Sequence, residues 1–292
     1  MGTDAFAAVT TLASEDTETV PPSEYGQTAN DLRFFPLLFE RRYMLRRSQV
    51  VASPTPVSSA KTHLFVFVHG YQGKRYDMYA WRSQVVIELE PCLKLSTLVS
   101  TANEAGKTDD DIELQGHRLA KEIKEHVRKL RLQNRVVEKI SFVSHSMGGL
   151  VTRAAIADDA FTHLRGLLHC FVSLASCHAG YLFQDSRATT AGFWILRKWS
   201  KSKSLRQLSL KDTPSDASDD SEEQLLLRMA RQESLKFFRH VLLFSAPDDM
   251  YTPWHSCRLE LHSKARTEAG VTARVYREMC QTLLGQLNFC ET

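Results

Sequence analysis

The chain has 292 residues, of which 43% are hydrophobic and 24% are charged. This composition is typical of a globular protein and provides enough apolar residues for one large domain or two small ones. The formal net charge of +3 is too small to indicate a nucleic-acid-binding protein, and no helical pattern carries a basic stripe interleaved with aromatic residues.

The cysteines and the N-terminus bear on whether the protein is a metal-binding, secreted or membrane protein. Six cysteines lie without CxxC or Cys/His spacing, so the sequence predicts neither a zinc site nor a disulfide framework. The N-terminus has no basic segment followed by an apolar run, and no stretch reaches the ~18 apolar residues that a membrane span needs. We therefore expect a cytoplasmic protein with reduced thiols.

Residues 1–60 are predicted to form a flexible lead-in and a peripheral segment, followed by one domain over residues 61–292. Residues 1–30 are rich in Thr, Ser, Ala, Glu and Pro, which favours an irregular chain. Residues 32–49 mix Phe and Leu with Arg, which is compatible with an interfacial helix on a membrane or with a segment packed on the domain. Pro36 interrupts the pattern and favours the second, while peripheral membrane contact stays open.

The domain begins with a strand. Residues 63–68 are a continuous apolar run, as expected for a strand buried on both faces of a parallel sheet. It ends in His69-Gly70-Tyr71-Gln72-Gly73, a glycine turn. A helix at residues 79–90, a strand at 95–100 and a helix at 112–132 are predicted next. The acidic triplet 109–111 could bind a metal, but three consecutive carboxylates point in different directions, which favours interaction with the helix dipole.

Residues 139–150, KISFVSHSMGGL, predict a buried strand, a tight turn and a helix. This is the context of a nucleophile elbow, in which a serine lies on a strained bend. The neighbours two before and two after must be small, and Ser144 and Gly148 meet that demand. An ordinary strand-to-helix turn is the alternative. Ser146 is therefore the candidate nucleophile.

The glycine turn after the first strand is the candidate oxyanion loop. In α/β-hydrolases this loop supplies one backbone N–H of the oxyanion hole, and the residue after the nucleophile supplies the other. Gly70 would allow a close approach of the ester. The candidate donors are the N–H of Tyr71 or Gln72, together with that of Met147. The alternative is a plain glycine turn.

A further buried strand is predicted at residues 168–175, so the alternation of strands and helices predicts a doubly wound, mostly parallel sheet. A long insertion, residues 181–236, then precedes the last strand. Residues 192–203 place an apolar cluster beside cations, which is compatible with a lid facing an anionic lipid surface or with a packed helix whose lysines reach solvent. The acidic stretch 211–223 is predicted to be a disordered loop.

Residues 241–246 predict the last strand, which leads into Pro247-Asp248-Asp249-Met250-Tyr251-Thr252-Pro253. An acid on the loop after a late strand is where the triad carboxylate of an elbow enzyme belongs. Such a carboxylate orients the histidine base. We prefer Asp249 because D-x-x-T-P resembles the D-x-x-V-P of many lipases, and the alternative is an Asp-rich turn.

Five ordered motifs, VFVHGYQG, GHRLAKEI, SFVSHSMGG, SLASCHAG and SAPDDMYTPWHS, together resemble the serine esterase family, a lipase-like branch of the α/β-hydrolases. The resemblance covers residues 63–287 and implies an α/β-hydrolase fold with ester or lipid hydrolysis. Ser144 replaces the usual Gly, and Cys177 stands where the family tends to have Pro.

The position of the catalytic histidine is the larger departure from the family pattern. The resemblance places the triad histidine after one further strand, whereas no histidine follows His262. A domain truncated at its C-terminus and a binding protein that kept the fold are the two interpretations. His255 and His262 follow Asp249, but His255 is only six residues beyond it and His262 is predicted to lie on a helix over 256–265. His69, His145 and His178 correspond to loop or elbow residues of the family.

Two functions follow from these patterns. The first is a serine esterase or lipase with Ser146, Asp249 and His255 as catalytic residues, Gly70, Tyr71 and Met147 at the oxyanion hole, and no metal or organic cofactor. Its partner would be a small-molecule or lipid ester and not nucleic acid. The second is a catalytically impaired, hydrolase-like binding module that lacks the triad histidine.

Overall fold

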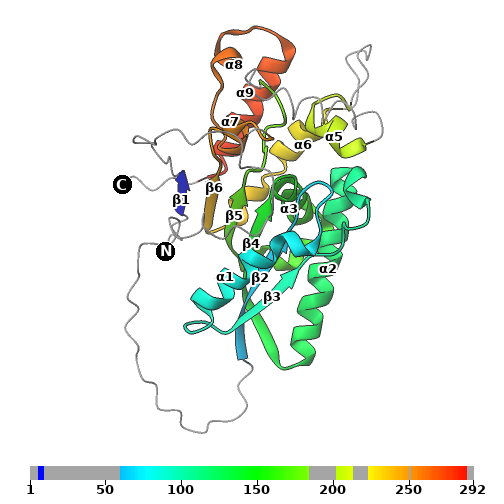
Figure 1. Ribbon diagram of the computed structural model, residues 1–292, viewed down its shortest axis with the longest axis vertical. Coiled ribbons are helices and arrows are strands. Elements are labelled where there is room, and N and C mark those ends of the chain that lie inside the picture. The colour runs from blue at the N-terminus through cyan, green and yellow to red at the C-terminus, as the bar shows by residue number, and fades with distance from the viewer. Residues whose placement is uncertain (1–5, 10–59, 184–201, 213–222, 250, 288–292) are drawn as a thin grey trace, which may run out of the picture. The chain divides into compact units, whose positions relative to one another are not determined.

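The computed structural model describes residues 6–9, 60–183, 202–212, 223–249 and 251–287. Its centre is a sheet whose strands are all parallel and lie in the order β1-β6-β5-β4-β2-β3 (Figure 1). The strands are β1 (Phe6–Val9), β2 (Ala60–Val68), β3 (Leu95–Val99), β4 (Arg135–His145), β5 (Leu168–Leu174) and β6 (His240–Phe244). The predicted α/β class and parallel sheet are confirmed.

Helices pack on both faces of the sheet. The α-helices are α1 (Tyr79–Leu89), α2 (Ile112–Leu132), α3 (Gly148–Ala157), α5 (Lys203–Leu208), α6 (Leu225–Arg231), α7 (Trp254–Cys257), α8 (Ser263–Thr267) and α9 (Val271–Leu284). Short 3-10 helices are η4 (Arg75–Met78), η5 (Lys107–Asp109), η6 (Asp159–Leu167) and η8 (Ser234–Phe237). The predicted helices before and after β3 correspond to α1 and α2.

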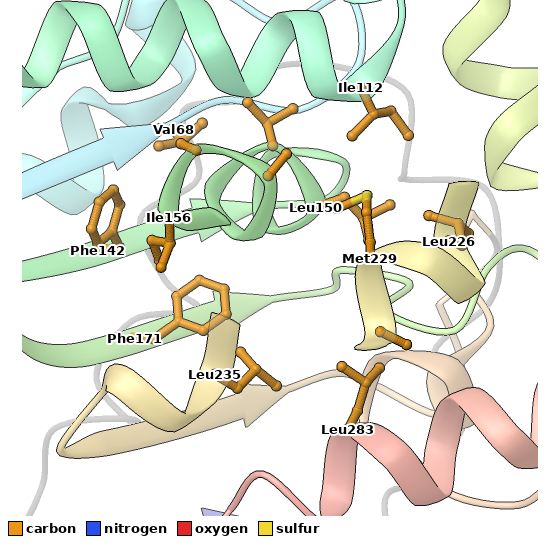
Figure 2. Packing of buried hydrophobic residues seen from close by; sticks show 14 of the residues in the cluster. Val68, Ile112, Phe142, Leu150, Ile156, Phe171, Leu226, Met229, Leu235 and Leu283 are labelled. Atoms are coloured by element: carbon orange, nitrogen blue, oxygen red, sulfur yellow. The ribbon is translucent and has the colours of Figure 1, made fainter. Parts of the chain in front are cut away.

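The larger hydrophobic core lies between the sheet and the face covered by α2 and α3. It draws Leu64, Val66 and Val68 from β2, because alternate residues of a strand point to one face. Figure 2 shows Ile156 of α3 close to the rings of Phe142 and Phe171, which come from β4 and β5. The opposite face carries Phe65 and Phe67 and packs against residues of α1.

The three carboxylates of the acidic triplet before α2 bind different partners. Asp111 is the N-cap residue of α2, and its carboxylate accepts hydrogen bonds from the backbone N–H of Glu113 and Leu114. Asp110 pairs with Arg118 at 2.7 Å, and Asp109 accepts a hydrogen bond from the Tyr71 hydroxyl. The three carboxylates therefore diverge, as the sequence predicted.

The order of the strands places a topological switch point between β2 and β4. The chain leaves β2 toward β3 on one side and returns to β4 on the other side. In open parallel sheets the crevice beyond the carboxyl ends of such strands is where ligands bind. The loops after β2 and β4 contain the residues predicted to form the oxyanion hole and the nucleophile.

Two parts of the chain differ from the sequence predictions. Phe6–Val9, inside the predicted flexible lead-in, pairs in parallel with the edge strand β6 as β1, because an exposed strand edge offers unpaired backbone groups to a short apolar run. The single helix predicted at 256–265 is wrong. Leu259 adopts a φ of 59° and separates α7 from α8, so His262 is the N-cap residue of α8.

The insertion before β6 contains α5 and α6, and both contribute buried leucines to the larger core. In Figure 1 these helices lie toward the end of the sheet to which the strand arrows point. The lid predicted at 192–203 and the acidic loop predicted at 211–223 lie mostly outside the described residues.

Candidate active site

The turn between β4 and α3 has the geometry of a nucleophile elbow. β4 ends at His145 and α3 begins at Gly148, so the predicted strand-turn-helix context is present. Ser146 adopts a φ of 54°, a left-handed conformation that a non-glycine residue rarely takes. Its backbone N–H donates to the carbonyl of Leu174 on β5 at 2.8 Å, which ties the bend to the neighbouring strand.

Glycines make this bend sterically possible. A Cβ on Gly148 would lie 2.6 Å from the carbonyl oxygen of Val68, and a Cβ on Gly70 would lie 2.8 Å from the Cβ of Ser146. Backbone segments therefore meet at distances that a larger residue would prevent. Ser144, which stands where the family usually has Gly, is buried, and its hydroxyl bonds the hydroxyl of Thr152 in α3 at 2.8 Å. That partner explains why a serine is accommodated here.

The loop after β2 carries two candidate oxyanion donors, the backbone N–H groups of Tyr71 and Gln72, and one of them is already hydrogen-bonded. The backbone N–H of Gln72 donates to the hydroxyl of Thr108 at 3.0 Å, whereas Tyr71 and Met147 line a cavity together with Ser146. No described residue accepts a hydrogen bond from the N–H of Met147. The geometry thus favours Tyr71 over Gln72 as the partner of Met147.

Asp249 lines the same cavity as Ser146. It lies on the loop after β6, where its Oδ1 accepts hydrogen bonds from the backbone N–H of Tyr251 at 2.7 Å and of Thr252 at 3.0 Å. The Thr252 hydroxyl bonds the other carboxylate oxygen. These hydrogen bonds fix the position of the carboxylate at the carboxyl edge of the sheet, which is the edge that carries the elbow.

The histidines are distributed differently from a catalytic triad. His255 is 3% exposed, and its Nε2 lies 3.0 Å from the carbonyl oxygen of Leu182. Its ring packs against the rings of His262 and Tyr276 with centroids 4.7 and 5.8 Å away. Among the described residues, no histidine is hydrogen-bonded to the Ser146 hydroxyl, and His255 does not line the cavity.

His145 is the histidine that lines the cavity. Partial burial of its ring lowers its pKa, and the carboxylates of Asp249 and Asp77 oppose this effect. The elbow sequence makes His145 a direct chain neighbour of Ser146. Its side chain leaves β4 on the opposite side from the buried Ser144, because alternate strand residues face opposite ways.

The cavity has a volume of about 430 Å³, and apolar side chains form much of its wall. Leu205 and Leu208 of α5 form part of this wall, with Tyr181 and Cys177. The sequence analysis missed these residues. A signal was present, because Ser202 begins a short helix as its N-cap residue and the two leucines follow at a spacing of three.

A buried arginine lies in α3, the helix that follows the elbow. Arg153 of α3 is 1% exposed, and its Nη1 donates to the carbonyl oxygen of His178 at 3.0 Å. Burial lowers the pKa of Arg153 to about 9, and burial together with the nearby guanidinium lowers the pKa of His178 well below its usual value. His178 is therefore a neutral structural histidine, whose Nε2 bonds the hydroxyl of Ser173 at 2.8 Å.

Cys177, which stands where the family tends to have Pro, is also a neutral group. Burial, reinforced by contact with the Cys257 thiol 3.9 Å away, raises its pKa well above the ordinary value. The thiol therefore contributes apolar surface to the cavity. Within the described residues, no group of three or more His, Cys, Asp or Glu side chains is arranged to hold a metal ion.

A parallel sheet with helices on both faces and a serine on a strained strand-to-helix bend define the class as an α/β-hydrolase. Residues 58–259 match the family described as "Putative serine esterase (DUF676)", and the chain belongs to that family. The match covers β2 through α7 and ends shortly after the loop that carries Asp249.

The solved structures that are similar to this chain include a phospholipase and an uncharacterized protein. Phospholipase PlaB from Legionella pneumophila is 14% identical with a TM-score of 0.40, and the match covers 67% of this chain and 42% of that one. An uncharacterized protein from Bacillus cereus ATCC 10987 is 18% identical with a TM-score of 0.33, over 67% of this chain and 55% of that one. This chain thus spans less than two thirds of the length of either protein. None of the described helices is long and apolar enough to cross a membrane.

Proposed function

We propose that this protein is a serine hydrolase that cleaves carboxylic esters with apolar acyl groups. The observation that carries the proposal is the strained Ser146 in a partly apolar cavity that also contains Asp249. Left-handed backbone at a non-glycine residue costs about 1–3 kcal/mol and is concentrated at functional sites. An apolar wall next to that serine favours an acyl chain as the group that fills the cavity.

In the proposed mechanism the Ser146 hydroxyl attacks the ester carbonyl and forms a tetrahedral intermediate. The N–H groups of Tyr71 and Met147 stabilise the oxyanion, and a histidine accepts the serine proton and then protonates the leaving alcohol. Asp249 orients that histidine and stabilises its charged form. Water then cleaves the acyl-enzyme by the same steps in reverse.

His255 is the candidate base, but its Nε2 already contacts another group. A base has to come within about 3.2 Å of the serine oxygen or reach it through one water. The Nε2 of His255 instead lies 3.0 Å from the carbonyl oxygen of Leu182, so Nε2 has to leave that carbonyl before this nitrogen can accept the serine proton. The same contact favours the second candidate function, an impaired hydrolase-like module that binds an ester or lipid without turning it over.

A fluorophosphonate probe separates the two functions. It should label the wild-type chain, and Ser146→Ala should remove the label because the probe bonds covalently to an activated serine. Ser173→Ala is a matched control, since Ser173 is buried and lies outside the cavity. Absence of labelling in wild-type protein with a cooperative unfolding transition would support the binding module.

The identity of the base requires a second comparison. If His255 is the base, His255→Gln should lower hydrolysis of p-nitrophenyl butyrate by several orders of magnitude, since loss of the triad base in subtilisin costs ~10⁶ in turnover. His262→Gln is the control, because the ring of His262 packs at a tilt against that of His255 and His262 is the N-cap residue of α8. Equal activity of the two variants would exclude His255 as the base.

A further inference from the structure

The segment that precedes α2 contacts two walls of the cavity. Thr108 lies within η5 and is 2% exposed. Its hydroxyl accepts the hydrogen bond from the backbone N–H of Gln72, 36 positions earlier in the chain. This bond joins the loop after β2, which carries the candidate oxyanion donor Tyr71, to a buried anchor.

The loop needs such an anchor because of its backbone conformation. The N–H of Gly73 donates to the carbonyl of Gly70 at 3.0 Å, which closes a tight turn with Tyr71 and Gln72 at its centre. Gln72 adopts a φ of 53°, which favours Gly or Asn at the third position of a turn. Rotation of the Tyr71–Gln72 peptide would relieve that strain, and the bond to Thr108 opposes the rotation.

The backbone carbonyl of Thr108 is hydrogen-bonded to α5, the helix that forms part of the apolar wall of the cavity. Its backbone oxygen accepts hydrogen bonds from the Ser204 hydroxyl at 2.6 Å and from the Gln115 amide at 3.1 Å. Ser204 belongs to α5, whose Leu205 and Leu208 line the cavity. The side chain of Gln207, also in α5, accepts a hydrogen bond from the N–H of Ile112 at 3.0 Å. One buried segment thus fixes both the candidate oxyanion loop and α5.

We propose that Thr108 is a positioning residue, which holds the oxyanion loop in register with the α5 wall of the acyl cavity. This role rests on the proposed esterase function. The Thr108 hydroxyl holds the Gln72 peptide, so that the N–H of Tyr71 meets the oxyanion while the acyl chain rests on α5. Thr108 touches no substrate atom and acts through the loop.

Thr108→Val tests the hydroxyl, because valine keeps the shape of the side chain and leaves the backbone carbonyl that binds Ser204. Thr108→Ser keeps the hydroxyl and should restore the wild-type behaviour. Thr62→Val is the matched control. Thr62 is also 2% exposed, and its hydroxyl donates to the carbonyl oxygen of Ala60 at 3.1 Å, at the opposite end of β2.

With p-nitrophenyl butyrate, Thr108→Val should lower kcat by about 10-fold or more while KM stays within about twofold. Outright loss of an oxyanion donor costs ~10²–10³ in kcat, and a misplaced donor should cost less. Affinity for a trifluoromethyl ketone, whose tetrahedral adduct carries an oxyanion, should fall by the same factor as kcat. Thr62→Val should change neither quantity. Equal kcat and inhibitor affinity in the two valine variants would overturn the role of Thr108.

Amide hydrogen exchange gives a readout that needs no turnover. The Gln72 amide should exchange faster in Thr108→Val than in wild type, Thr108→Ser or Thr62→Val, because its acceptor is removed. Unchanged exchange at Gln72 would refute the inference, even in a chain that hydrolyses nothing. Faster exchange in a chain that neither turns over esters nor reacts with fluorophosphonate would uphold the anchor and refute the esterase function instead.

Discussion

Gly70 and Ser146 lie so close together that a side chain at position 70 would change the position of the Ser146 side chain. An added Cβ on Gly70 would stand 2.8 Å from the Cβ of Ser146 and 3.3 Å from its hydroxyl oxygen. Gly70→Ala should therefore displace the serine or the loop and lower kcat/KM for p-nitrophenyl butyrate by about 10²-fold, as misplacements near 1 Å do. Steady-state kinetics on both proteins check this.

Gly166→Ala is the matched control for that comparison. A Cβ at Gly166 would meet nothing within 4 Å, so the substitution adds a methyl group without a contact. Its kcat/KM should equal that of wild type. Wild-type activity in Gly70→Ala would mean that the close approach seen between these two residues has no part in catalysis.

Residue-level patterns predicted the elbow but not the surroundings of the histidines. Ser146 could be found because the required small residues, Ser144 and Gly148, lie only two positions away in sequence, so the steric demand is visible locally. The contact of His255 depends on Leu182, 73 positions away. Likewise, Gln72 could not be separated from Tyr71 until its bond to Thr108 was known. Partners brought together only by the fold leave no local pattern.

At the scale of elements, α5 is a fixed wall of the cavity. Leu208 is 9% exposed and lines the space in front of Ser146. Leu208→Ala should enlarge the acyl cavity and shift the preferred p-nitrophenyl ester toward longer chains, by roughly 10-fold in the ratio of octanoate to butyrate kcat/KM, because one missing contact of this size is worth ~1–3 kcal/mol.

Leu210→Ala provides the control for that shift. Leu210 is 8% exposed, follows α5 directly and does not line the cavity. Both variants should lose a similar amount of stability, roughly 2–5 kcal/mol, since each removes a buried leucine side chain. An unchanged chain-length ratio in Leu208→Ala, with the same loss of stability as Leu210→Ala, would show that the acyl group does not contact α5.

Regular elements were predictable where their periodicity was strong. The amphipathic helix α2 begins at Ile112 and ends at Leu132, as predicted, because its apolar positions recur on one face and Asp111 caps its start. The interruption between α7 and α8 was missed, since a left-handed Leu259 has no sequence signature comparable to glycine. The short α5 was missed because its cap residue and two leucines make a weaker pattern than the long apolar stripe of α2.

At the scale of the whole molecule, the sheet separates two chemically different ends. The elbow and Asp249 lie at the carboxyl ends of the strands. At the amino ends, His63, His169 and His240 follow one another across β2, β5 and β6, with ring centroids 5.3 and 5.1 Å apart. Lys139 of β4 lines the same surface groove, which has a volume of about 510 Å³.

This histidine row makes the stability of the fold sensitive to acid. Burial, together with neighbouring positive groups such as Lys139, lowers the pKa values of His63 and His169 to about 4. Both are depressed below the value of 6.5 expected for the unfolded chain. Between pH 6.5 and pH 4 the unfolded state therefore binds more protons than the folded state, and the free energy of unfolding falls as the pH falls.

Lowering the pH from 7 to 5 should thus reduce the free energy of unfolding by roughly 1 kcal/mol for each of these histidines, after discounting for their partial exposure. Urea unfolding of the double variant His63→Gln/His169→Gln should show a weaker pH dependence than wild type. Cys170→Ser is the control in the same groove, because burial raises the pKa of Cys170 to about 11, outside this pH range. If the double variant and the wild type lose the same free energy between pH 7 and pH 5, the acid sensitivity of the fold arises elsewhere than in this row.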